Sequence, residues 1–140
     1  MNLAETFLAS VPSGFFHALT SLQVLILNGN QFATMPEDLQ HAIHLEYLNL
    51  NNNPIKEFHV ESFNGLVNLK KLNISAMPSL EKIGINTFTP LSSMTSLWCS
   101  FNPALKHIDP GAFNNMARSD ETLQLSEVWN LSQLNFGIHS

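Results

Sequence analysis

The feature of this sequence that most constrains its fold is a set of apolar positions that occurs four times along the chain. In the first copy the pattern reads Leu22-x-x-Leu25-x-Leu27-x-x-Asn30-x-Phe32. Its first position returns at Leu45, Leu69 and Met94, so successive copies start 23, 24 and 25 residues apart. The later copies contain Leu45, Leu48, Leu50, Asn53 and Ile55, then Leu69, Leu72 and Ile74, then Met94, Leu97, Cys99 and Asn102. A period of this length indicates a repeat protein, in which each unit stacks on the next.

The second half of each unit repeats as well. Its apolar residues follow one another at offsets of 3, 5, 3 and 3, as in Leu8, Val11, Phe16, Leu19 and Leu22. Leu39 takes the place of phenylalanine in the second unit, which is one residue shorter. Because equivalent positions of stacked units lie above one another, we expect an aromatic column inside the outer side of the array. The column would contain Phe16, Phe63, Phe88 and Phe113.

The two halves of a unit predict different local structures. Leu25 and Leu27 alternate with Val24, Ile26 and Asn28, and this period of two is typical of a short strand with its leucines inward. One unit cannot bury its leucines alone, so neighbouring units share one continuous core. The sequence therefore predicts an α/β-type solenoid. We expect a parallel sheet on the concave face and mostly irregular, 3-10 or short helical segments on the convex face.

The length of the chain fits one domain, which we place over residues 1–140. Residues 1–21 form a partial first unit in this interpretation. Full units follow at 22–44, 45–68, 69–93 and 94–119, and a degenerate terminal unit occupies 120–140.

Composition excludes several classes of function. The net charge is -5 and the basic residues are scattered except at Lys70 and Lys71, so no nucleic-acid surface is expected. No apolar run approaches the roughly 18 residues of a membrane span, and we expect no direct membrane insertion. Residues 1–20 lack the basic and apolar regions of a signal peptide. Cys99 is the single cysteine, so the sequence predicts no internal disulfide.

The quoted residues resemble the leucine-rich repeat family, in its typical subclass of about 24 residues per unit. The segments NPIKEFHVESFNGLVNLKKLNI and NPALKHIDPGAFNNM look like animal extracellular or receptor-ectodomain repeats. This resemblance implies a secreted or cell-surface protein that binds a ligand on its concave sheet. The cysteine-rich end caps common in extracellular members are absent, and Leu3 stands at the second strand-leucine position. The chain therefore looks like a fragment or an array with irregular ends.

The frame assigns a direction to each strand residue, and the residues between the inward leucines face the concave side. Five strands about 4.8 Å apart make an open face that suits a protein or an extended peptide better than a small molecule. Exposed aromatic residues on such a face are candidate anchors, although they would also serve to cover the sheet. A lysine there could meet an acidic partner or simply be solvated. The candidate protein-binding residues are Tyr47, Asn49, Lys71, Asn73, Ser96, Trp98 and Phe101.

Two triplets match the N-glycosylation acceptor, at Asn73-Ile74-Ser75 and at Asn130-Leu131-Ser132. They matter only if the chain enters the secretory pathway. A glycan on Asn73 would lie on the concave face and obstruct binding there, whereas Asn130 lies near the C-terminal edge.

The sequence indicates no catalytic, cofactor-binding or metal site. Cys99 takes an inward strand position, where it is expected to be a small buried side chain. His41 and His44 are three residues apart, but the frame places no carboxylate or cysteine beside them. An interaction module is therefore the leading hypothesis. The alternatives are self-association through uncapped ends, which would bury terminal leucines, and an enzyme that uses the histidine and cysteine residues.

Overall fold

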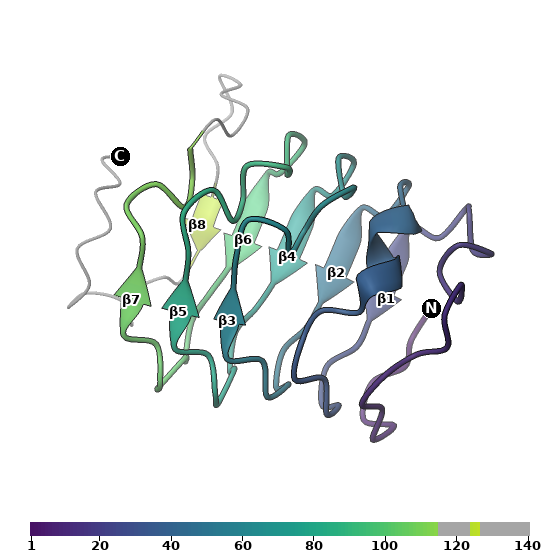
Figure 1. The fold of residues 1–140 in the computed structure, drawn as a ribbon, viewed down its shortest axis with the longest axis horizontal. Helices are drawn as coiled ribbons and strands as arrows, with labels where there is room; N and C mark the ends of the chain where they lie inside the picture. Colours follow the sequence, from purple (N-terminus) through teal and green to yellow (C-terminus); the bar gives the residue numbers. More distant parts are fainter. Residues whose placement is uncertain (115–123, 127–140) are drawn as a thin grey trace.

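The computed structural model describes residues 1–114 and 124–126, and it shows a solenoid whose strands are all parallel. The concave face is a five-stranded sheet in the order β1-β2-β4-β6-β8 (Figure 1). Its strands are short and occur once per unit, so the predicted leucine-rich repeat solenoid is confirmed. They are β1 (Val24–Ile26), β2 (Tyr47–Asn49), β4 (Lys71–Asn73), β6 (Ser96–Trp98) and β8 (Gln124–Ser126).

The register of this sheet follows the leucine frame. Leu25 pairs with Leu48, Leu48 with Leu72, and Leu72 with Leu97. All four side chains are buried, and the inward residues two positions later form a second buried layer. The strand period of two therefore places one leucine of every strand in a continuous core.

The convex side carries a second sheet that the sequence analysis did not predict. It consists of β3 (Glu57–Phe58), β5 (Lys82–Ile83) and β7 (His107–Ile108), which pair in parallel in that order. Each strand buries one apolar residue and exposes a charged or imidazole side chain. Equal spacing of these two-residue segments in successive units lets their backbones pair.

The second unit departs from this arrangement. It carries the 3-10 helix η1 (Glu37–His41) on the convex side, with Leu39 buried. Beside it, the rings of Phe63, Phe88 and Phe113 are in series, with centroids 5.9 and 4.9 Å apart, and this part of the predicted aromatic column is confirmed. Phe16 is buried but contacts the ring of Phe15, since Leu39 takes the intervening place in the column.

Buried asparagine side chains join the units through hydrogen bonds. The Asn53 Nδ2 atom donates to the Leu27 carbonyl of the preceding unit at 3.0 Å, and Asn53 Oδ1 accepts from the Phe32 amide at 3.1 Å. Asn30 and Asn102 also donate to carbonyls of the preceding unit, at Leu3 and Ile74. The repeated asparagine thus satisfies backbone groups that stacking would otherwise bury without partners.

The turn after each concave strand requires a left-handed backbone. Positive φ angles of 51 to 71° occur at one equivalent position per unit, in residues Glu5, Gly29, Asn52, Ala76 and Phe101. This region of φ favours glycine and tolerates asparagine, but it is costly for a large side chain. Phe101 is therefore the least suited of the five residues to its conformation.

Helices are a minor part of the array. Within the described ranges, no helix is long and apolar enough to cross a membrane.

Candidate binding face

The concave sheet presents two rows of outward side chains, which we call the first row and the second row. Parallel register joins the members of each row across neighbouring strands. The first row holds Val24, Tyr47, Lys71 and Ser96, and the second row holds Ile26, Asn49, Asn73 and Trp98. Six of the seven residues predicted for binding belong to these rows, so the structure brings them onto one surface.

Their exposure differs along the sheet. Lys71 is exposed, and Tyr47, Ser96 and Trp98 are half-buried. Val24, on the outward side of β1, is 42% exposed. β1 therefore adds an exposed apolar side chain to the concave face, separate from the aromatic residues.

Phe101 lies in the turn that follows β6 and not on a strand. Its side chain is 66% exposed and its φ is 56°. The neighbouring Ser100 is buried, and its amide donates to Ser75 Oγ at 3.1 Å. Phe101 thus stands three residues after Trp98, the last residue of β6, with its ring exposed.

The asparagines of the face are held by backbone amides. Asn49 Oδ1 accepts from the Asn51 amide at 2.9 Å, and Asn51 Oδ1 accepts from the Ser75 amide at 2.8 Å. The Ser75 amide also donates to Asn73 Oδ1 at 3.2 Å. The bonds to Asn49 and Asn73 are local, from amides two residues further along the chain. The bond from the Ser75 amide to Asn51 joins two units, and the strand frame alone carries no sign of it.

Charge on the face is sparse. The Lys70 ammonium is 3.2 Å from the Glu46 carboxylate, and both side chains are about half exposed. A surface ion pair of this kind contributes at most about 1 kcal/mol to stability. Among the strand positions of β1, β2, β4 and β6, Lys71 is the charged residue.

The groups considered for chemistry lie away from this face or inside the core. Burial raises the pKa of the Cys99 thiol from 9.0 to about 12, against the opposing effect of the Asn102 hydrogen bond. The His41 ring packs on His17, with centroids 4.7 Å apart, and both are exposed on the convex side. No group of three metal-ligating side chains occurs in the part of the chain that the structure describes. Asn130 lies outside the described residues, whereas Asn73 is half-buried on β4.

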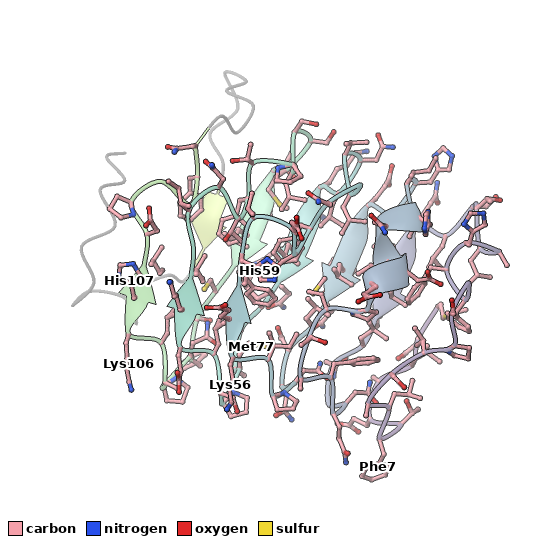
Figure 2. All side chains as sticks on the ribbon, in the orientation of Figure 1. Phe7, Lys56, His59, Met77, Lys106 and His107 are labelled. Carbon is pink, nitrogen blue, oxygen red and sulfur yellow. The ribbon has the colours of Figure 1, made fainter. Side chains whose placement is uncertain are left out.

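The convex side is shown with its side chains in Figure 2. His59 and His107 lie on this side, and Lys56 and Lys106 extend from the lower ends of β3 and β7. Glu57 pairs in register with Lys82 and Lys82 with His107, so an acidic, a basic and an imidazole side chain stand side by side there. Neither sign of charge accumulates on the second sheet.

Comparison with known proteins identifies the repeat. A family model described as leucine rich repeat matches residues 1–55 and 43–103. Tsukushi-A of Xenopus laevis is 34% identical over 83 residues, which cover 59% of this chain and 23% of that protein. Tsukushi of Gallus gallus is 29% identical over 108 residues, which cover 77% of this chain and 29% of that protein.

Solved structures give the same fold. The structure titled "Crystal structure of TLR13-ssRNA13 complex" matches with a TM-score of 0.50 and 28% sequence identity, over 81% of this chain and 23% of that one. The chain therefore spans less than a third of the length of each of these relatives.

Proposed function

This chain belongs to the leucine-rich repeat family, and from that premise we propose that its concave face binds a protein or peptide ligand outside the cell. Three features of the described residues support the proposal. The face is open and lined by two rows of outward side chains. Its aromatic residues stand at positions where other units carry no aromatic side chain: Val24, Lys71 and Ser96 for Tyr47, Ile26, Asn49 and Asn73 for Trp98, and Gly29, Asn52 and Ala76 for Phe101. The segments that look like extracellular repeats support the compartment.

The observation that carries this proposal is the conformation of Phe101. A phenylalanine in the left-handed region costs roughly 1–2 kcal/mol, and the exposed ring recovers nothing by burial in the core. A residue that opposes its local preference and gains no packing is a candidate for a functional role. A ligand seated on the face would bury this ring together with Trp98, as expected of aromatic anchors.

A nucleic-acid ligand fits these residues less well. The matched receptor structure is that of a complex with single-stranded RNA. Phosphate recognition needs clustered Lys and Arg. Here the strands of the concave face offer Lys71, beside a Lys70 that is already paired with Glu46.

A random peptide library displayed on phage tests the proposal. The Kd of each peptide enriched on the native chain would then be measured for that chain and for the variants Trp98→Ala, Tyr47→Ala and Phe101→Asn. We expect losses of about thirtyfold for Trp98→Ala, which corresponds to about 2 kcal/mol. His107→Ala is the matched control, because His107 is exposed on the convex sheet. Urea unfolding of each variant verifies that the fold is kept. Equal binding by the concave variants would contradict the proposal.

Self-association is a second candidate, favoured by the exposure of the first unit. Phe7 is 80% exposed and extends away from the array (Figure 2). Leu3 and Leu8 are only partly buried beside it. A second copy of this chain packed on that end would cover all three. Sedimentation at concentrations from micromolar to millimolar tests this candidate, and a constant monomer mass would contradict it.

A further inference from the structure

The side-chain amide groups of three asparagines on the concave face share one orientation relative to the backbone. A backbone N–H can donate a hydrogen bond to the side-chain oxygen of asparagine but not to its side-chain nitrogen, which is itself a donor. The bonds from the Asn51 and Ser75 amides therefore fix which atom of Asn49, Asn51 and Asn73 faces the backbone. In each case it is Oδ1, so the Nδ2 group is turned the other way.

These three Nδ2 groups have no hydrogen-bond partner among the residues that the structure describes. They also do not occur among the buried side-chain atoms without a partner in those residues, so solvent reaches them. Each carries two N–H donors. The acceptor capacity of Asn49, Asn51 and Asn73 is thus directed at the protein, and their donor capacity is left for a ligand.

Lys71, the charged residue beside these donors, also favours a ligand that carries hydrogen-bond acceptors. Lys71 is exposed in the first row, between Tyr47 and Ser96 in register. It neighbours Asn73 on β4, two residues away on the same face. Glu46, which directly precedes β2, is paired with Lys70. The surface therefore offers donors and one positive charge, and it lacks an uncommitted carboxylate at its strand positions.

We propose that the concave face recognises a carboxylate-bearing segment of its ligand, an acidic peptide stretch, through the amides of Asn49, Asn51 and Asn73 together with Lys71. This inference rests on the proposed function and specifies its partner. Neighbouring strands lie about 4.8 Å apart, and an N–H···O bond spans about 2.9 Å. The Asn49 and Asn73 donors, on adjacent strands, can therefore both reach one carboxylate placed between them. Hydrogen bonds to an ionised acceptor are shorter and stronger than neutral ones.

An acidic peptide is a better match than a nucleic acid. Carboxylates are acceptor-only groups that amide donors satisfy without a high density of cations. A phosphate backbone would place repeated charges on a face whose strands provide one lysine, in a chain of net charge -5. Single-stranded RNA is nevertheless included as a competing probe in the test.

The decisive variants replace the side-chain NH2 donor of an asparagine and keep the oxygen that accepts from the backbone. In Asn49→Asp and Asn73→Asp the carboxylate still accepts from the Asn51 and Ser75 amides, so the turn geometry is kept, while the outward donors become a negative charge. Asn64→Asp, at an exposed convex position, is the matched control. The probes are an eight-residue peptide of alternating Glu and Ser, its Gln analogue, and a single-stranded oligouridylate. The readouts are Kd and the NMR signals of the side-chain amide groups.

We expect the Glu peptide to bind at least about tenfold more tightly than the Gln analogue and to shift the Nδ2 signals of Asn49, Asn51 and Asn73. Each Asn→Asp variant on the face should weaken binding about tenfold or more, Lys71→Gln should weaken it and reduce its salt dependence, and Asn64→Asp should leave it unchanged. Equal binding of the two peptides, or tighter binding of the oligouridylate, overturns the inference. If library-selected peptides lose affinity for Trp98→Ala but not for the Asn→Asp variants, the inference fails and the proposed function stands.

Discussion

Asn73 and Trp98 are register partners across β4 and β6, so the asparagine of a glycosylation triplet lies beside the largest aromatic side chain of the concave face. The Nδ2 atom that would carry the glycan has no partner among the described residues and is open to solvent. A sugar attached there would cover Trp98 and remove one of the outward donors. Modification and ligand binding should therefore exclude each other at this position.

We predict that the chain secreted from animal cells with a supplied leader carries a glycan at Asn73 and binds concave-face peptides at least tenfold more weakly than the same chain made in bacteria, where this residue stays an unmodified asparagine. Mass spectrometry before and after glycan removal measures occupancy. Asn73→Gln, which cannot be modified, identifies the fraction of the mass shift that belongs to this residue. Equal affinity of the glycosylated chain and the bacterial chain would contradict the prediction.

Asn53→Ala should destabilise the array strongly. The Asn53 side chain is fully buried and bonds the Leu27 and Leu50 carbonyls and the Phe32 amide. Each buried backbone group left without a partner costs about 1–3 kcal/mol, so we expect a loss of about 3 kcal/mol or more in the free energy of unfolding. Urea unfolding measures it. The adjacent Asn52→Gly is the control and should be neutral or slightly stabilising, because Asn52 is exposed with a φ of 56°.

Phe101→Asn should separate stability from binding. Asparagine tolerates a positive φ better than phenylalanine, and it occupies the equivalent position in the third unit as Asn52. We expect the free energy of unfolding to stay the same or to rise by up to about 1 kcal/mol, while peptides selected on the concave face bind more weakly. A loss of stability in this variant would show that the ring packs on the fold and would remove the main support for its role as an anchor.

Cys99 should be unreactive in the folded chain. Its thiol is buried with a pKa of about 12, so little thiolate forms at neutral pH. A maleimide reagent at pH 7.5 should label the native chain at least a hundredfold more slowly than the chain in denaturing urea. Rapid labelling of the native chain would contradict the burial.

The Cys99 thiol also makes the free energy of unfolding depend on pH in the alkaline range. Between pH 9 and 12 the unfolded chain loses the thiol proton while the folded chain retains it. Unfolding then releases a proton, so the free energy of unfolding falls by about 1.4 kcal/mol per pH unit in this window, and this contribution is fully retained below pH 9. Urea titrations at pH 8, 9, 10 and 10.5 measure the slope. Cys99→Ala is the reference, because it shares every other ionisable group with the native chain, and parallel slopes would contradict the prediction.

Two glycines with positive φ should respond differently to the same substitution. Gly65 and Gly14 have φ of 82 and 79°, so alanine is strained at both. A Cβ atom at Gly14 meets open space, whereas one at Gly65 would overlap the Gln40 carbonyl of η1. Gly14→Ala should cost about 1 kcal/mol from φ alone, and Gly65→Ala should cost about 1–3 kcal/mol more through the backbone clash. Equal midpoints in urea would show that the second and third units do not approach so closely.

The sequence by itself determined the repeat frame and the direction of the strand side chains. Both follow from short-range periods: the leucines of the frame recur every 23 to 25 residues, and alternate strand residues face opposite sides. The positions of Tyr47, Lys71 and Trp98 on one surface could be read from those periods alone. The aromatic column could also be predicted, apart from Phe16, because Leu39 interrupts it.

The tertiary structure decided what depends on contacts between units. The sheet formed by β3, β5 and β7 needs backbone pairing between segments 25 residues apart, and two-residue strands leave almost no local signal. The donor orientation of Asn51 results from the Ser75 amide of the next unit, which only stacking brings within reach. Phe101 lies in a turn because the strand of its unit ends at Trp98. Hydrogen-bond partners separated by a whole repeat are brought together by stacking, and the local pattern of apolar residues contains no record of them.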